Sequence, residues 1–381
     1  MIRLLTVVGA RPQIIKAAAV SRAVRGRFAG RIDERILHTG QHYDPSMSQV
    51  FFEELGIPEP DYNLGVGSGS HGTQTARMIE GIERVLLEGD FDGILLYGDT
   101  NSTLAGAVAA SKVHIPVFHV EAGLRSHDMT MPEETNRIVC DRVSSILFPP
   151  TQAAFDNLVR EGFMSSDDVF SGGKRRKICL SGDIMLDNSL YYQELAGQRS
   201  DILSRLDLEP SPFALATVHR QANTDDPARL NGIIDALTEL SKRIKVVLPL
   251  HPRTKNRLSS LDPGTAARLQ SSPGMILTGP VSFFDIILLE KHAQIVLTDS
   301  GGVQKESFFF GTPSVIFREE TEWVEIVENG CGILAGAEKE RILRASSLLQ
   351  GKRDGFPRLF GDGHAAEKIL ECILEYLNEE S

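Results

Sequence analysis

The sequence has few of the residues that cross-link small or secreted proteins. Only four of its 381 residues are cysteines, and these, Cys140, Cys179, Cys331 and Cys372, form no CxxC pair. Isolated cysteines predict neither a zinc site nor a disulfide framework. They favour a reducing compartment, so we expect a cytoplasmic protein without a metal ion.

Long hydrophobic runs and a surplus of basic residues are also missing. The first apolar run, Ile2–Val8, contains Arg3 and is too short for a secretory signal or a membrane span. The 51 Asp and Glu residues outnumber the 40 Lys and Arg residues, which gives a formal net charge of −11. Nucleic-acid phosphates are bound by surplus Lys and Arg, so we expect neither a nucleic-acid nor a membrane partner. We interpret the basic run Lys174–Lys177 as a solvated loop.

The common nucleotide-binding fingerprints are absent from the first turn. After Val8 the chain reads Gly9-Ala10-Arg11-Pro12-Gln13, which is not GxGxxG, and no GxxxxGK[ST] is present. These absences argue against a dinucleotide cofactor and against a P-loop nucleotide site. We therefore expect a protein that works without a cofactor.

What the sequence does contain is a regular alternation of short β-branched or leucine-rich runs with longer amphipathic stretches, typical of parallel sheets with crossover helices. A first series of strands is expected at Leu4–Val8, Arg35–His38, Gly93–Tyr97, Val117–Val120 and Ile146–Phe148. Helices are expected between them at Ile14–Arg25, Met47–Leu55, His71–Glu88, Ser102–Val113 and Glu133–Val143. A second series of strands is expected at Ile178–Leu180, Phe213–Thr217, Lys245–Leu250, Met275–Leu277, Ile295–Thr298 and Ser314–Phe317.

This pattern and this length, at roughly 100–200 residues per domain, predict two domains. We predict an α/β fold with two doubly wound, Rossmann-like domains, residues 1–172 and 173–363, facing a central cleft. The helical segment 364–381 packs at the domain junction or back on the first domain. Ligands of such sheets bind beyond the carboxyl ends of the strands, so functional groups should follow the strands.

Basic and acidic side chains follow the strands of the first half. Pro12 suits the first position of a helix, and Arg11 with Lys16 would place two positive charges near that helix start, as a pyrophosphate site needs. The alternative is a surface Arg and Lys beside a tight turn. Three carboxylates, Asp99, Glu121 and Glu133, follow later strands or open a helix. Each also has a structural explanation, such as capping a helix start, but three at successive strand ends would face one cleft.

The second half has complementary groups. His219 and His251 each follow a strand and each precede an Arg by one or two positions. The segment Ser300-Gly301-Gly302 follows another strand, and adjacent glycines let a backbone approach a phosphate at a helix start. Glu306, one helical turn on, is placed to accept hydrogen bonds from the two hydroxyls of a ribose. Together these groups predict a site for a nucleoside diphosphate.

These segments together resemble the UDP-N-acetylglucosamine 2-epimerase family, non-hydrolysing type, whose fold is the two-domain glycosyltransferase-B architecture. Four motifs occur in the family's order and spacing: GDT at Gly98, HVEAGLR at His119, PEExNR at Pro132 and TDSGGxQxE at Thr298. The resemblance spans nearly the whole chain. It implies a UDP-sugar substrate and a homodimer.

The resemblance also implies roles for the residues already singled out. Asp99, Glu121 and Glu133 would carry acid/base chemistry, with His219 assisting. Arg11 and Lys16 would contact the nucleotide sugar, and Ser300, Gly301, Gly302 and Glu306 would hold its diphosphate and ribose. The remaining candidates for substrate binding are Arg137, His251 and Trp323.

The reaction expected of such residues follows from the chemistry of the sugar. Carbon 2 of an acetamido sugar has no neighbouring carbonyl, so its proton is not simply removed as for an enolate. Elimination of UDP from carbon 1 gives an unsaturated glycal, and re-addition of UDP with protonation from the opposite face gives the epimer. That route needs bases on both faces and stabilisation of the departing diphosphate. Clustered carboxylates raise one another's pKa, which helps one of them to hold a proton.

Several positions depart from the family's usual pattern. Gln13 stands where the family has Glu, and Trp323 stands where it commonly has an Arg that contacts substrate. Tyr43-Asp44-Pro45 replaces a basic continuation that some members use for activation by a second substrate molecule. These changes point to a branch acting on a modified sugar such as UDP-2,3-diacetamido-glucuronate. Core packing of Trp323 is as good an explanation as a sugar contact.

Three alternatives to interconversion of UDP-GlcNAc and UDP-ManNAc, or of a modified UDP-HexNAc, stay open. The first is a hydrolysing 2-epimerase that releases UDP. The second is a UDP-sugar glycosyltransferase of the same fold. The third is a non-catalytic sensor of nucleotide sugars.

Overall fold

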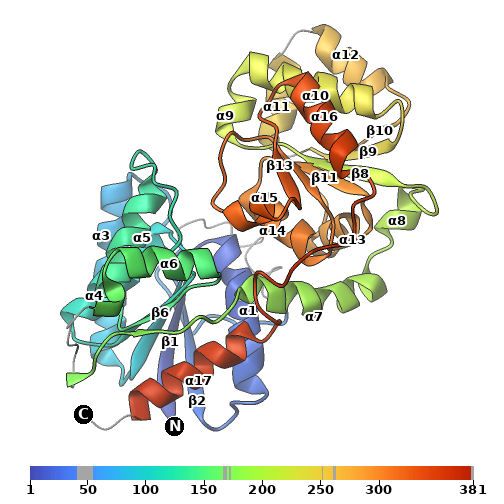
Figure 1. Cartoon of the computed structure of the whole chain (residues 1–381). Coiled ribbons are helices and arrows are strands. Elements are labelled where there is room, and N and C mark those ends of the chain that lie inside the picture. The colour runs from blue at the N-terminus through green and yellow to red at the C-terminus, as the bar shows by residue number, and fades with distance from the viewer. Residues whose placement is uncertain (41–54, 166–169, 171–172, 251, 261–262, 379–381) are drawn as a thin grey trace. The chain divides into compact units, whose positions relative to one another are not determined.

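The computed structural model describes residues 1–40, 55–165, 170, 173–250, 252–260 and 263–378. Two compact units share the chain: Met1–Asn188 together with Arg358–Ser381, and Ser189–Pro357. Each unit is built on one parallel sheet covered by helices (Figure 1). The prediction of two Rossmann-like α/β units is confirmed.

The first unit holds a seven-stranded sheet in the order β3-β2-β1-β4-β5-β6-β7. Its strands are β1 (Ile2–Val8), β2 (Ile32–His38), β3 (Tyr62–Asn63), β4 (Gly93–Tyr97), β5 (Val117–Val120), β6 (Ile146–Phe148) and β7 (Lys177–Ile178). Its helices are α1 (Arg11–Arg25), α3 (His71–Glu88), α4 (Asn101–Lys112), α5 (Pro132–Val143), α6 (Gln152–Arg160) and α17 (Ala365–Asn378), with a 3₁₀ turn at Phe163–Ser165. Helices α3, α4 and α5 pack in sequence, and α17 packs against α1 (Figure 1).

The second unit holds a six-stranded sheet in the order β10-β9-β8-β11-β12-β13. Its strands are β8 (Phe213–Thr217), β9 (Lys245–Pro249), β10 (Met275–Thr278), β11 (Ile295–Thr298), β12 (Ser314–Ile316) and β13 (Gly332–Leu334). Its helices are α8 (Ile202–Arg205), α9 (Gln221–Thr224), α10 (Pro227–Leu240), α11 (Pro252–Ser260), α12 (Pro263–Ser271), α13 (Phe283–His292), α14 (Gly301–Phe309), α15 (Val324–Glu328) and α16 (Lys339–Leu349). Helix α7 (Ile184–Arg199) runs from the first unit into the second.

Burial explains why these runs form central strands. Every residue of β4 and of β5 is buried, as expected for strands of a parallel sheet with helices on both faces. In the second unit the apolar residues of β8, β9 and β11 form one core with α10 and α16. The sequence runs that lack alternation are therefore the ones that lie at the centre of each sheet.

Both sheets have a point at which the strand order reverses. In the first unit this switch point lies between β1 and β4, and in the second it lies between β8 and β11. Loops after neighbouring strands diverge to opposite faces there and leave a crevice at the carboxyl ends. Arg11 and Asp99 follow the two strands of the first switch point, and His219 and Ser300 follow those of the second.

The strand predictions were largely right. The structure differs from the predicted strands and domain bounds in three ways. The segment predicted as Ile178–Leu180 to begin the second sheet pairs instead with β6 in the first sheet, as β7. Strands β3 and β13 are two and three residues long and were not predicted. The units divide at Asn188 rather than at residue 172, and α17 belongs to the first unit. The predicted helix Met47–Leu55 lies outside the described residues except for Leu55.

The expectation that no cysteines pair was wrong. Cys179, directly after β7, forms a disulfide with Cys372 in α17. Their separation of 193 residues explains why spacing did not reveal the pair. Cys140 and Cys331 are free and buried.

The basic run after residue 173 has a structural use. Lys174 donates to the carbonyls of Tyr376 (2.6 Å) and Leu377 (3.1 Å) at the end of α17. Arg176 donates to the carbonyls of Arg142 and Ser144 at the end of α5. Cations at helix C-termini satisfy carbonyls that have no partner within the helix. Among the residues with assigned structure, no helix is long and apolar enough to cross a membrane.

Candidate functional site

The turn between β1 and α1 is anchored by Gln13, a buried side chain. Its Oε1 accepts from the backbone N–H groups of Gly9 (2.9 Å) and Ala10 (3.2 Å). Its Nε2 donates to the carbonyl of Tyr97 (2.9 Å), at the end of β4. A glutamate carboxylate at this position would lack the N–H donor that Gln13 supplies. The amide at this position therefore ties the two strands of the switch point together, while Arg11 beside it is exposed.

Asp99 follows β4 and is held by two residues of the PEExNR segment. Arg137 Nη2 donates to Asp99 Oδ2 (2.5 Å), and Asn136 Nδ2 donates to the Asp99 carbonyl (2.8 Å). Burial raises the pKa of Asp99 above its usual value, the charges of Arg137 and Lys16 lower it, and Glu121 raises it again. The net shift is upward, which suits a group that must exchange a proton near neutral pH.

Glu121 follows β5 and shares this corner of the first unit. The buried Glu121 carboxylate forms an ion pair with Lys16 Nζ. Lys16 therefore neutralises the carboxylate cluster, whereas it was predicted to contact the substrate. Glu121 has a left-handed backbone, with φ of 67°, and Gly98 beside it has φ of 64°. Such a conformation is unfavourable for a residue with a Cβ, so the surrounding structure must impose it.

The two acids at the start of α5 differ in their surroundings. Glu133 is exposed in the first turn of the helix, whereas Glu134 is buried. Glu134 accepts from the N–H groups of Ser126 (3.0 Å) and His127 (3.0 Å) and pairs with Arg137 (2.8 Å). Burial would raise the pKa of Glu134, but these hydrogen bonds hold it below its usual value. Glu134 is thus a fixed anion, and of the two acids only Glu133 is accessible.

A buried charged network that the sequence did not reveal lies beneath this corner. His119 in β5 contacts the Asp141 carboxylate in α5 (2.7 Å), and Arg125 bridges Asp141 (2.8 Å) and Glu161 (2.7 Å). His119 and Arg125 belong to the HVEAGLR segment, but nothing in the spacing marks Asp141 or Glu161 as their partners. The contacts join residues 22 and 36 positions apart.

In the second unit His219 is held by Asp299, another residue that was not singled out. The fully buried Asp299 carboxylate accepts from the backbone N–H groups of His219 (3.1 Å) and Arg220 (3.0 Å) and from Asn223 Nδ2 (3.1 Å). It also lies 3.3 Å from His219 Nδ1. The imidazole itself is 40% exposed. Asp299 therefore orients a partly exposed histidine at the carboxyl end of β8.

The Ser300-Gly301-Gly302 segment opens α14 as predicted. Ser300 is the N-cap, and its hydroxyl accepts from the N–H of Val303 (3.4 Å). A side chain at Gly301 would overlap the Glu322 carboxylate, which is paired with Arg318 (2.7 Å). A side chain at Gly302 would meet nothing closer than Ser300 Oγ at 3.8 Å. The helix start is thus packed on one side and open on the other, as an anion site at a helix N-terminus requires.

Two further groups lie along α14. Glu306 is half-buried, and Glu290 in α13 is fully buried nearby. Burial, together with the negative charge of Glu306, raises the pKa of Glu290 well above its usual range. Glu290 therefore favours its protonated form beside Glu306, the residue predicted to hold a ribose.

Trp323 is buried and lies beside the same helix start. The Lys305 ammonium stands 4.2 Å from the centre of its ring, and its Nε1 lies 3.6 Å from where a Cβ at Gly301 would be. The backbone N–H of Trp323 donates to Thr321 Oγ1 (3.2 Å). Trp323 is therefore packed in the core and also lies close to the predicted diphosphate site.

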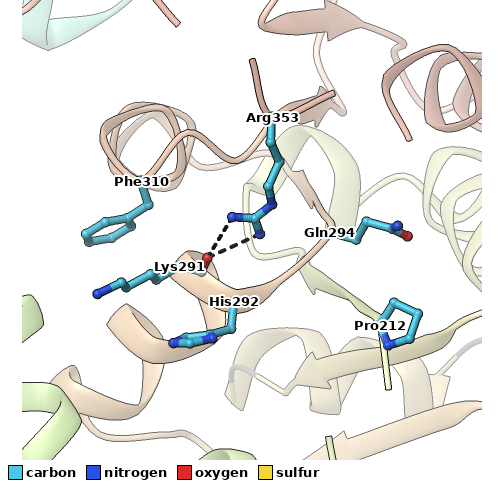
Figure 2. Close-up of a pocket in the computed structure, with 6 residues that line it drawn as sticks. All are labelled: Pro212, Lys291, His292, Gln294, Phe310 and Arg353. Atoms are coloured by element: carbon cyan, nitrogen blue, oxygen red, sulfur yellow. Dashed lines mark hydrogen bonds between the residues drawn. The ribbon is translucent and has the colours of Figure 1, made fainter. Parts of the chain in front are cut away.

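A cavity of about 430 Å³ lies at the other end of the second sheet (Figure 2). It is lined by Pro212 and Gln294, which precede β8 and β11, and by Lys291, His292, Phe310 and Arg353. Figure 2 shows the Arg353 guanidinium directed at the Lys291 carbonyl, to which it donates twice (3.2 Å each). Arg353 thus caps the end of α13. The cavity is at the amino ends of the strands, away from the crevice that binds ligands in this fold.

Two parts of the predicted site are not placed. His251 and the segment Tyr43-Asp44-Pro45 lie outside the described residues. Within the described ranges, no group of three or more His, Cys, Asp and Glu side chains is arranged to hold a metal ion.

Comparisons with known proteins show the family to which the chain belongs. The family model for UDP-N-acetylglucosamine 2-epimerase matches residues 27–374. The UDP-2,3-diacetamido-2,3-dideoxy-D-glucuronate 2-epimerase of Pseudomonas aeruginosa is 46% identical over 375 residues, covering 97% of this chain and 99% of that protein. The crystal structure of Methanocaldococcus jannaschii UDP-GlcNAc 2-epimerase in complex with UDP-GlcNAc and UDP matches with a TM-score of 0.84 at 38% identity, covering 98% and 100% of the two chains.

A more distant match shows how widely the fold occurs. The structure of Phytolacca americana UGT2 complexed with UDP-2fluoro-glucose and pterostilbene matches with a TM-score of 0.59 at 13% identity, covering 98% and 94% of the two chains. At this identity the match shows the fold alone. The model match and the two close relatives span nearly the whole chain. This protein therefore belongs to the UDP-N-acetylglucosamine 2-epimerase family and is an isomerase, a UDP-sugar 2-epimerase.

Proposed function

We propose that this protein inverts carbon 2 of a UDP-HexNAc without net hydrolysis, and that its preferred substrate is a UDP-2,3-diacetamido-2,3-dideoxy-glucuronate. The observation that carries the choice of sugar is the 46% identity to the Pseudomonas aeruginosa enzyme named for that substrate, against 38% to the UDP-GlcNAc enzyme of Methanocaldococcus jannaschii. Trp323 stands where a substrate-contacting Arg is common, which also supports a modified sugar.

The first unit would supply the proton chemistry. Asp99 has a raised pKa and suits the group that holds a proton, while Glu121, paired with Lys16, suits a group that stays ionised. Glu133 is exposed at the start of α5 and is the third acid/base candidate. Two neighbouring carboxylates with different environments are what removal and return of a proton on opposite faces requires.

The second unit would hold UDP. The open side of the Ser300-Gly301-Gly302 helix start suits the diphosphate, and Glu306 suits the ribose hydroxyls. His219, oriented by Asp299 and partly exposed, would stabilise the departing diphosphate or shuttle its proton. These groups favour leaving-group departure, which the elimination of UDP requires.

A product assay over a small panel of UDP sugars tests the proposal. Proton NMR would follow UDP-GlcNAc, UDP-2,3-diacetamido-glucuronate and its 3-hydroxy counterpart, each incubated with the full chain. We expect inversion at carbon 2 with the highest kcat/KM for the diacetamido-glucuronate and no net release of UDP.

Other outcomes would replace the proposal. Free UDP accumulating in step with turnover would identify a hydrolysing enzyme. Transfer of the sugar to an added acceptor without an epimer would identify a glycosyltransferase, and tight binding without any turnover would identify a sensor. We also propose that the protein acts in the cytoplasm as a homodimer, as family membership suggests, and sedimentation of the purified protein would measure its oligomeric state.

A further inference from the structure

The imidazole of His119 has a hydrogen-bond partner at each nitrogen. It is fully buried in β5, and its Nε2 lies 2.8 Å from the carbonyl oxygen of Gly98. A carbonyl oxygen only accepts, so Nε2 must carry a proton and donate it. On the other side Nδ1 lies 2.7 Å from the Asp141 carboxylate.

The Asp141 carboxylate already accepts from two other donors, so the proton of this contact also belongs to Nδ1. The carboxylate accepts from the Gly123 N–H (3.1 Å) and pairs with Arg125 (2.8 Å). Burial would raise the pKa of Asp141, but His119 and Arg125 hold it below its usual value. An ionised carboxylate has no proton to give to Nδ1.

The fully buried Asp141 carboxylate shares its cationic partner with another acid. Arg125 also pairs with Glu161, whose side chain is 34% exposed, so His119 is the second group that can neutralise Asp141. The neighbouring Cys140 adds no charge, because burial raises the pKa of its thiol well above the usual value. A buried charge without a partner is strongly unfavourable, so a second cation at His119 completes the set.

We propose that His119, held as a buried imidazolium by Asp141, is a positioning residue that fixes the Gly98–Asp99 peptide against the strand that carries Glu121. The proposal rests on the proposed function, since it concerns the spacing of the two acid/base groups. It adds a role for a motif residue that does not reach the substrate.

The local backbone explains why such a residue is needed. Gly98 and Glu121 both have left-handed conformations, so neither continues the regular strand geometry that would hold it. One backbone bond, from the Gly98 N–H to the Val120 carbonyl (3.0 Å), joins the two strand ends at this level. The His119 contact secures the carbonyl of the same residue, which is part of the Gly98–Asp99 peptide. With both backbone groups of Gly98 fixed, Asp99 leaves β4 in one direction only.

Two substitutions separate the two contacts of the imidazole. In His119→Gln the amide nitrogen reaches the place of Nε2 and keeps the donor to Gly98, whereas in His119→Asn it reaches the place of Nδ1 and keeps only the contact with Asp141. Misplacing a catalytic group by about 1 Å costs on the order of 100-fold in rate. We expect kcat to fall by roughly that factor in His119→Asn and by roughly tenfold or less in His119→Gln, with KM and UDP affinity little changed.

Equal losses in the two variants, or losses confined to KM, would overturn the positioning role. Because either variant could also fold poorly, the protonation state is measured in the wild-type chain. Nitrogen-15 NMR of histidine-labelled protein, with the His119 signals identified by their loss in His119→Gln, should show protons on both ring nitrogens at neutral and mildly alkaline pH. A neutral ring there would contradict the proposal even if epimerisation is found. Absence of epimerisation with a doubly protonated ring would instead reject the proposed function.

Discussion

Asp187 connects helix α7 to helix α17, the C-terminal helix of the first unit. Its buried carboxylate, in α7, accepts from the N–H groups of Ala365 (2.8 Å) and Ala366 (3.3 Å) at the start of α17. Burial raises the pKa of Asp187 from 3.8 to about 6, and the two N–H groups only partly oppose that shift. The folded protein therefore binds the Asp187 proton more tightly than the unfolded chain does.

The sign and size of the stability effect follow from this shift. Between pH 3.8 and about pH 6 the folded state holds a proton that the unfolded state has lost, so stability must fall as pH rises through this window. The difference of 6 − 3.8 ≈ 2 pKa units corresponds to roughly 3 kcal/mol. The stabilisation is fully present below about pH 4 and is lost above about pH 6.

Asp187→Asn removes the titrating group while keeping one oxygen to accept from α17. Urea unfolding of wild type and variant at several pH values, followed by circular dichroism, gives the difference in free energy of unfolding. We expect the wild type to lose roughly 3 kcal/mol relative to the variant between pH 4 and pH 7. Glu88→Gln, at an exposed position of the same unit, is the matched control. Parallel curves for wild type and Asp187→Asn, or a difference that grows in favour of the wild type as pH rises, would refute the reasoning.

Four other substitutions test the site. Glu121→Gln should lower kcat by roughly 100-fold, the scale of a general acid/base group, with UDP affinity by calorimetry unchanged; unchanged turnover would exclude this role. Gly301→Ala should lower the free energy of unfolding by about 1 kcal/mol because its Cβ displaces the half-buried Glu322 carboxylate from its ion pair, whereas Gly302→Ala should be as stable as wild type but bind UDP more weakly; equal stability of the two would contradict the packing. Asp299→Asn should lower kcat by roughly tenfold with UDP affinity retained, because His219 loses the charge that orients it; a loss of UDP affinity alone would contradict that role.

Strand positions were predictable because central strands of parallel sheets are continuous apolar runs. Gly93–Tyr97 and Val117–Val120 are buried throughout, and each was predicted with the bounds that the structure has. The short edge strand Tyr62–Asn63 carries no such run, since two residues are too few for a pattern. The sheet to which Lys177–Ile178 belongs depends on pairing with Ile146–Phe148, which no local pattern contains.

The candidate site was predictable to the extent that it follows strand ends. Asp99, His219 and Ser300 lie at the switch points because they follow β4, β8 and β11, the strands that flank those points. Their partners were not predictable, because ion pairs such as Arg137 with Asp99 depend on side-chain packing between elements distant in sequence. The pairing of Lys16 with Glu121 was not predictable for the same reason.

Solvent deuterium at carbon 2 tests proton removal and return most directly. The full chain would be incubated in deuterated water with the UDP sugar that the product assay selects, and the epimer would be examined by proton NMR and mass spectrometry. Elimination and re-addition predict one deuterium at carbon 2 of the product and none at the other ring carbons. An epimer that keeps its original hydrogen at carbon 2 would contradict the assignment of the carboxylate cluster as the acid/base machinery.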